Sequence, residues 1–178
     1  MSTPPFDRPS EAEIAIVSRQ IGRPARNVIG IAARCVCGAP TVVATDPRLD
    51  DGTPFPTLYY LTHPAATAAI STLEATGAMP KFAELLDDES MAAAYLAAHQ
   101  AYLADRESIE HVTEIEGISA GGMPQRVKCL HALAAHSLAA GPGVNPIGDL
   151  ALEWADWSPS VCQCEDPETS NSAVSSAG

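Results

Sequence analysis

The segment NVIGIAARCVCGAPTVVATDPRLDDGTPFPTLYYLT, residues 27–62, decides the fold class of this chain. It contains three β-prone runs, VIGIAARC, TVVAT and LYYLT. The first two are separated by the turn CVCGAP, and the last two by a proline-rich loop that cannot be helical. We therefore expect a small three-stranded antiparallel sheet over residues 28–62.

Helical patterns lie on both sides of this segment. Upstream, Ser10 and Glu13 have the spacing of a capping box, and Gly22 is a stop signal. Downstream, helices are predicted over 64–77, 80–87, 90–108 and 124–141, followed by a short amphipathic piece near residues 154–157. Because the apolar residues are mostly alanine, which favours helix, four to five alanine-rich helices should pack on the sheet in an α+β fold.

The domain organisation follows from the same patterns. One α+β domain is expected over residues 10–160. A flexible arm is expected at 1–9, and a disordered tail rich in serine and acidic residues at 165–178.

Composition argues against several classes of partner. The net charge is −12 and the pI is near 4.6, so nucleic acid and anionic lipid should both be repelled. The N-terminus is polar, and no apolar run approaches the ~20 residues that a bilayer requires. We expect a cytoplasmic protein without membrane or nucleic-acid partners. Structural disulfides are rare in the cytoplasm, so the five cysteines should be metal ligands or reactive thiols.

The cysteines offer two ways to complete the four ligands that structural zinc takes. Both begin with the Cys-x-Cys pair of the first turn, Cys35 and Cys37. One set adds Cys129 and a histidine, with His63 at the end of the third strand as the first choice and His131 and His136 as the other donors. The other set adds the C-terminal pair Cys162 and Cys164. An iron–sulfur cluster is a weaker fit, because the spacing does not match the familiar ferredoxin patterns.

Helix geometry bears on the first set. Cys129 and His136 are seven residues apart and share a helix face, whereas His131 lies about 200° from Cys129 at ~100° per residue. If Cys129 lies inside a regular helix, Cys129 and His131 should therefore not serve one site.

A glycine-rich stretch, GISAGGMPQRVK at residues 117–128, is a candidate anion site. Gly121 and Gly122 precede the predicted helix start, where free N–H groups attract anions, and Arg126 and Lys128 add positive charge. This pattern suggests an enzyme that acts on a phosphorylated or carboxylated small molecule, with His131 as general acid or base. Structural capping explains the same residues, and a thiol-redox protein is a third possibility. A small anion or a protein is the expected partner.

Three strings, RCVCGAPTVVATDPRLDDGTPFPTLYYLT, GISAGGMPQRVKCLHALAAH and GPGVNPIGD, resemble the bacterial, mainly actinobacterial, domain-of-unknown-function family 501. The resemblance covers residues 10–152. Members often carry a cysteine where this chain has His63, which implies a zinc site of Cys35, Cys37, His63 and Cys129. Family genes tend to lie near a septum-formation initiator and an exopolyphosphatase, which implies a link to cell division or phosphate metabolism. The leading hypothesis is a structural zinc domain with a binding or regulatory role.

Overall fold

The structure, a computed structural model, describes residues 6–164. The tail predicted at 165–178 and the first five residues of the arm lie outside the described residues. Within them the chain forms a three-stranded antiparallel sheet and six α-helices, which confirms the predicted α+β class. Among the described residues, no helix is both long enough and apolar enough to cross a membrane.

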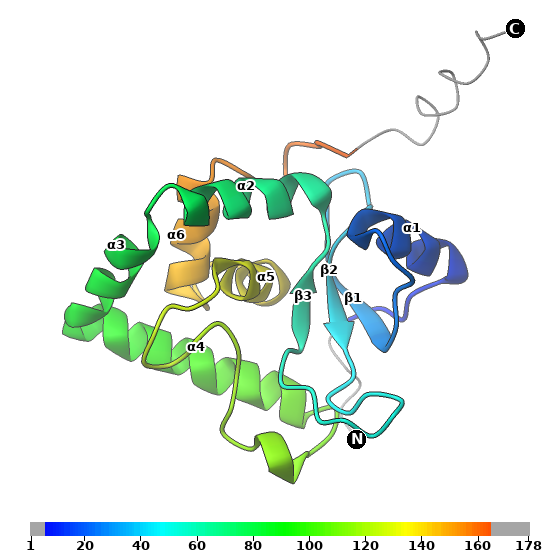
Figure 1. The fold of residues 1–178 in the computed structure, drawn as a ribbon, viewed down its shortest axis with the longest axis horizontal. Coiled ribbons are helices and arrows are strands. Elements are labelled where there is room, and N and C mark those ends of the chain that lie inside the picture. Colours follow the sequence, from blue (N-terminus) through cyan, green and yellow to red (C-terminus); the bar gives the residue numbers. More distant parts are fainter. Residues whose placement is uncertain (1–5, 165–178) are drawn as a thin grey trace, which may run out of the picture.

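The sheet is formed by β1 (Val28–Arg34), β2 (Pro40–Thr45) and β3 (Tyr59–Leu61), in the order β1-β2-β3 (Figure 1). Every residue of the central strand β2 is buried, so both faces of the sheet are covered. Residues 6–9 lie along the outer edge, where the N–H of Ile31 donates to the carbonyl of Asp7 at 2.9 Å. Phe6 packs so closely on Gly30 that a Cβ there would overlap the phenyl ring.

One face of the sheet is covered by α1 (Glu11–Ile21). The helix begins with the predicted capping box between Ser10 and Glu13 and ends at Gly22, which has a left-handed φ of 70°. Val17 of this helix packs on Ile31 and Val43 in a small separate cluster. Since side chains alternate along a strand, the neighbouring Val42 and Ala44 of β2 face the main core on the opposite side.

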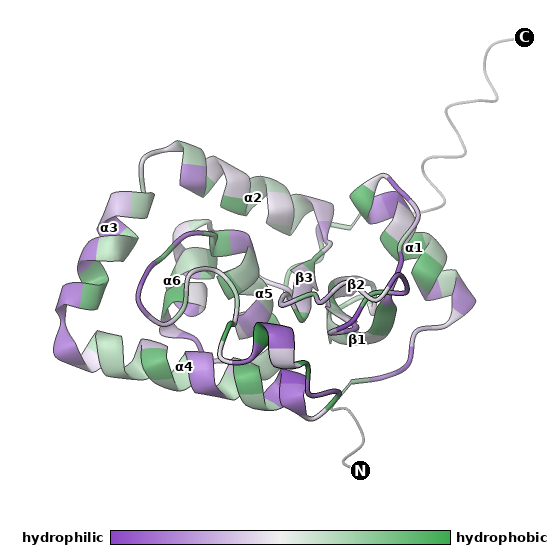
Figure 2. Ribbon diagram, turned by 60° about the horizontal axis from the view of Figure 1, so that its bottom comes forward, coloured by the Kyte–Doolittle hydropathy of each residue, from purple (hydrophilic) through white to green (hydrophobic). Residues whose placement is uncertain are grey.

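The main core lies between the sheet and five helices: α2 (Pro64–Ala75), α3 (Met79–Glu84), α4 (Glu89–Glu107), α5 (Leu130–Ala140) and α6 (Pro146–Trp154). A 3-10 turn, Leu85–Asp87, joins α3 to α4, and another covers Thr113–Ile115. In Figure 1, α5 is seen end-on at the centre, enclosed by α2, α4, α6 and β3. A helix in this position must be mainly apolar, as LHALAAHSLAA is, whereas the peripheral helices α3 and α4 alternate between hydrophilic and hydrophobic residues (Figure 2).

The helix predicted over residues 124–141 begins six residues later than expected, at Leu130. The preceding loop folds back on itself instead, because the N–H groups of Lys128 and Cys129 both donate to the carbonyl of Gly121. These bonds hold Cys129 in an extended conformation, with φ −146° and ψ 106°. The string GPGVNPIGD, residues 141–149, contains the start of α6, where the side chain of Asn145 accepts from the N–H of Gly148 as the N-cap.

Two packing features hold the helices in place. Gly148 of α6 lies directly against α5, where a Cβ would overlap the carbonyl oxygen of Leu133 and the hydroxyl of Ser137. Arg106 of α4 is 1% exposed. Its guanidinium donates to three backbone carbonyls, those of Pro56, Ile115 and Ile118. Arg106 thereby ties α4 to two irregular segments that have few regular hydrogen bonds of their own.

Candidate metal centre

The turn between β1 and β2 presents the first two thiols. The N–H of Cys35 donates to the carbonyl of Ala39, and the N–H of Gly38 donates to the carbonyl of Cys35, both at 2.8 Å. Gly38 has φ 92°, a left-handed value that favours glycine. The turn therefore has a fixed shape in which Cys35 is buried and Cys37 is exposed.

The segment after α6 returns to this turn and brings the second pair of thiols. Trp157 is 4% exposed and packs on the imidazole of His63, with ring centroids 5.2 Å apart. Two residues later, the carbonyl of Pro159 accepts from the N–H of Val36 at 2.8 Å. These two contacts fix the path of the chain, so that Cys162 and Cys164 lie over the turn.

The sulfur atoms of Cys35, Cys37, Cys162 and Cys164 all lie within 4.8 Å of one another, and none forms a disulfide. The sulfurs of Cys37 and Cys164 are 3.4 Å apart. Zn–S bonds of about 2.3 Å in a tetrahedron place two sulfurs about 3.8 Å apart, so the four thiols need only small shifts to bind one ion.

The pKa values of the thiols in this cluster shift in opposite directions. Hydrogen bonding to the backbone of Ala39 is the main cause that lowers the pKa of Cys37, to about 7. Burial raises the pKa of Cys164, and the neighbouring thiols raise it further. Four thiolates in one place repel each other, so a cation at their centre is what allows all of them to lose their protons.

His63 lies beside the cluster. It is 1% exposed and forms the N-cap of α2, where its Nδ1 accepts from the N–H of Ala66 at 3.4 Å. Because Nδ1 accepts, Nε2 carries the proton and donates to the sulfur of Cys164, 3.1 Å away. Burial lowers the pKa of His63, which favours this neutral form. In this arrangement the ring N–H of His63 is directed at the sulfur of Cys164.

Cys129 does not lie with Cys35, Cys37 and His63, the other residues of the favoured first set. It lies with Glu74 and His131 in a second group, whose ligand atoms are also within 4.8 Å of one another. Glu74 is in the last turn of α2 and His63 is its N-cap, eleven residues earlier, or about 16 Å away at 1.5 Å per residue. The structure therefore brings together the second predicted set, Cys35, Cys37, Cys162 and Cys164.

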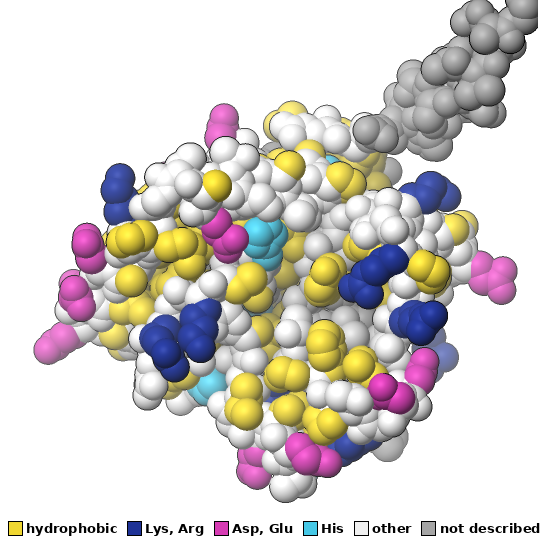
Figure 3. All heavy atoms as spheres, in the orientation of Figure 1, with side chains coloured by type: hydrophobic (Ala, Val, Ile, Leu, Met, Phe, Trp, Pro, Cys, Tyr) yellow, Lys and Arg dark blue, Asp and Glu magenta, His cyan; other side chains and the backbone are white. Residues whose placement is uncertain are grey.

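The expectation that Cys129 and His131 do not serve one site was made for a regular helix, and that condition does not hold. It assumed ~100° per residue within a helix, but Cys129 is the extended N-cap of α5 and not part of the helix. On the face drawn in Figure 3, a histidine side chain lies beside an acidic one over α2 and α5. Glu74 was missed from the sequence, although it is the only charged residue in PAATAAISTLEA, a signal that could have drawn attention to it.

His136 belongs to the core. It is fully buried, stacks on Tyr59 at 5.9 Å between ring centroids, and meets Tyr102 edge-on at 5.1 Å. Its Nδ1 lies 3.1 Å from the amide nitrogen of Asn145 and accepts from it. Burial lowers the pKa of His136 to about 4. Its environment is that of a neutral packing residue.

The glycine-rich loop has a different structure from the one that the anion hypothesis assumed. Arg126 and Lys128 are exposed and precede the helix instead of forming its first turns. Their N–H groups donate to the carbonyls of Gly122 and Gly121, at 2.9 and 2.7 Å, and so are not free for a ligand. Both glycines lie where a Cβ would overlap neighbouring atoms. This packing explains the glycines, and the anion site stays a prediction.

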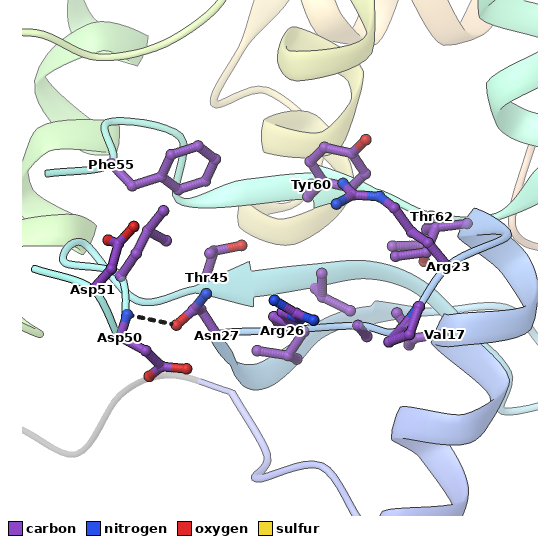
Figure 4. A pocket seen from close by; sticks show the side chains of 16 residues that line it. Val17, Arg23, Arg26, Asn27, Thr45, Asp50, Asp51, Phe55, Tyr60 and Thr62 are labelled. Carbon is purple, nitrogen blue, oxygen red and sulfur yellow. Dashed lines mark hydrogen bonds between the residues drawn. The ribbon is translucent and has the colours of Figure 1, made fainter. Parts of the chain in front are cut away.

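A groove of about 390 Å³ lies on the α1 side of the sheet. Figure 4 shows Phe55 and Tyr60 along it, with Arg23 and Arg26 nearer to α1 and Asp50 at the opposite end. The described residues that line this groove include no cysteine or histidine. It is therefore separate from the four-cysteine cluster and from the group of Glu74, Cys129 and His131.

Comparison with known proteins places the chain in a family. The family described as "Protein of unknown function (DUF501)" matches residues 31–153, more than half of the chain, and the chain belongs to this family. The resemblance found in the sequence is thereby confirmed. No match to a curated protein or to a solved structure was found.

Proposed function

We propose that this chain is a metal-stabilised binding or regulatory domain in which Cys35, Cys37, Cys162 and Cys164 hold one structural zinc ion. The observation that carries the proposal is the mutual approach of the four sulfur atoms to within 4.8 Å. Four protein thiolates fill a tetrahedral coordination sphere and leave no position for a substrate, which is typical of structural zinc. The ion would fasten the C-terminal segment to the β1–β2 turn.

The spacing supports a single ion over an iron–sulfur cluster. A tetrahedral ion draws its sulfur ligands to about 3.8 Å from one another, close to the observed Cys37–Cys164 distance of 3.4 Å. A cluster with several irons lies between its cysteines and separates them further. Zinc also suits this ligand set because it is redox-inert and prefers tetrahedral thiolate coordination.

The test is metal content combined with a count of free thiols. Full-length protein purified without chelator should contain zinc, and the double variant Cys162→Ser/Cys164→Ser should contain one ion less per chain. Ser160→Ala is the matched control, since it changes an exposed residue of the same segment, removes no thiol and should leave the zinc content unchanged. An unchanged zinc content in the double variant would refute the four-cysteine site.

A thiol-redox role is the second candidate, and the short distance between Cys37 and Cys164 favours it. In that case, protein purified without reductant would contain a disulfide between these two residues, detectable by peptide mapping, and no zinc at this cluster. Zinc binding predicts the opposite result, because thiolates that coordinate zinc are protected from oxidation.

A further inference from the structure

The second group of donor atoms lies where α2 ends and α5 begins, at the opposite end of α2 from His63 and the four cysteines. Glu74 is in the last turn of α2, Cys129 is the N-cap of α5, and His131 is in the first turn of α5. One ligand atom from each residue lies within 4.8 Å of the other two. The group combines one carboxylate, one thiol and one imidazole.

Each of the two non-sulfur donors is held by a neighbouring backbone group. Glu74 accepts the N–H of Leu130 through Oε1 at 2.8 Å, so its other oxygen, Oε2, remains for a second partner. Oε2 lies 3.4 Å from Nδ1 of His131. The carboxylate is therefore aimed at the centre of the group before any ligand arrives.

The imidazole is oriented in the same way. Nε2 of His131 lies 3.3 Å from the carbonyl oxygen of Thr67 and 3.0 Å from the hydroxyl of Ser71. A carbonyl only accepts, so Nε2 carries a proton. Nδ1 faces the group, where hydrogen bonding to Cys129 and the charge of Glu74 raise the pKa of His131, and a metal ion would replace the proton on that nitrogen. A ring N–H bonded to a backbone carbonyl, with the other nitrogen turned towards the remaining donors, is the usual arrangement of a metal-binding histidine.

We propose that Glu74, Cys129 and His131 form a second zinc site, with three protein ligands and a fourth position open to solvent. Sulfur, nitrogen and oxygen donors together suit zinc, whereas magnesium and calcium require oxygen donors. The side chains of His131 and Glu74 are 25% and 28% exposed, so solvent reaches the group. Three protein ligands and an exchangeable fourth are the pattern of zinc that polarises a bound water or carbonyl group. This inference is independent of the four-cysteine site.

The chain offers two variants that remove a ligand and preserve the local structure. Glu74→Gln retains an oxygen that can accept the N–H of Leu130 and loses the carboxylate charge. Cys129→Ser replaces an N-cap that makes no capping bond with a residue type that N-caps helices well, so α5 should still form. Glu84→Gln is the matched control, because it makes the same charge change at an exposed position on α3.

The experiment is equilibrium dialysis of the full-length variants against buffered free zinc, with metal measured by elemental analysis and folding checked by circular dichroism. Wild type and Glu84→Gln should bind two ions per chain and Cys129→Ser one. Glu74→Gln should bind the second ion at least about tenfold more weakly. Cobalt in place of zinc gives a second readout, because the ion lost in Cys129→Ser should have one thiolate ligand and a weaker charge-transfer band than the ion that remains.

Two outcomes would overturn the proposal. One is that Cys129→Ser binds as much zinc as wild type. The other is that Glu74→Gln and Glu84→Gln bind the second ion equally well, which also decides the question if Cys129→Ser fails to fold. Neither outcome depends on the four-cysteine site. Zinc binding at that site is tested separately by the zinc content of Cys162→Ser/Cys164→Ser.

Discussion

Removal of zinc from the four-cysteine cluster should destabilise the fold by an amount that follows from the position of its ligands in the chain. The sulfurs of Cys37 and Cys164 meet in the fold although 127 residues separate them in the sequence. To bind the same ion in the unfolded chain, that long loop must close, which costs about 5 kcal/mol in the chain-entropy treatment of cross-links. Folding has already closed the loop in the native state. Saturating zinc should therefore stabilise the native state by about that amount.

The assay is thermal unfolding followed by circular dichroism, with zinc and with a strong chelator. It is best performed in a Cys129→Ser background, so that only the four-cysteine site responds. For a chain of this length each kcal/mol moves the melting temperature by about 2–4 °C, so the chelator should lower it by about 10–20 °C. The further substitutions Cys162→Ser and Cys164→Ser should abolish that response. Equal melting temperatures with and without chelator in the background protein would refute the reasoning.

Three further predictions concern the framework around the sites. Gly148→Ala should destabilise the fold by about 1–3 kcal/mol in urea denaturation, because the new Cβ overlaps α5; an unchanged midpoint would contradict this packing. Arg106→Lys should cost about 1–3 kcal/mol in the same assay, since one ammonium cannot serve all three carbonyls; a loss below 0.5 kcal/mol, roughly the effect of a surface substitution, would be inconsistent. The folded-state pKa of His136, about 4, lies below the usual value of 6.5, so its contribution to stability is complete above pH 6.5 and lost as the pH falls to 4. The loss should be about 3 kcal/mol. An NMR titration of the His136 ring with a midpoint above pH 6 would disprove it.

Local sequence signals were sufficient to predict those elements whose structure depends on residues close together in the chain. The capping box at Ser10 and Glu13 and the stop at Gly22 each involve contacts within one helix, and α1 has both. The sheet was predictable because its strands are β-prone runs separated by turn residues. The start of α5 was not predictable in this way. Residues 125–129 have good helix propensity, but hydrogen bonds to the carbonyl of Gly121 hold them in another conformation.

For the candidate sites too, the sequence indicated the residue types and the tertiary structure decided which of them lie together. The sequence supplied every cysteine and histidine of both groups, and it offered the four-cysteine set as one of two alternatives. Choosing between the sets required the path of the chain after α6, which is fixed by Trp157 against His63 and by Pro159 against Val36. The association of Cys129 with His131 became visible only when Cys129 proved to lie outside the helix.

The sequence by itself determined the α+β class, most of the elements and the residue types that can bind metal. These follow from periodicity, capping and turn chemistry, which act over a few residues. The tertiary structure alone decided which donors share a site, because that depends on how distant segments pack. The approach of Cys164 to Cys37 and of Glu74 to His131 joins residues far apart in the chain, and no local pattern encodes either pairing.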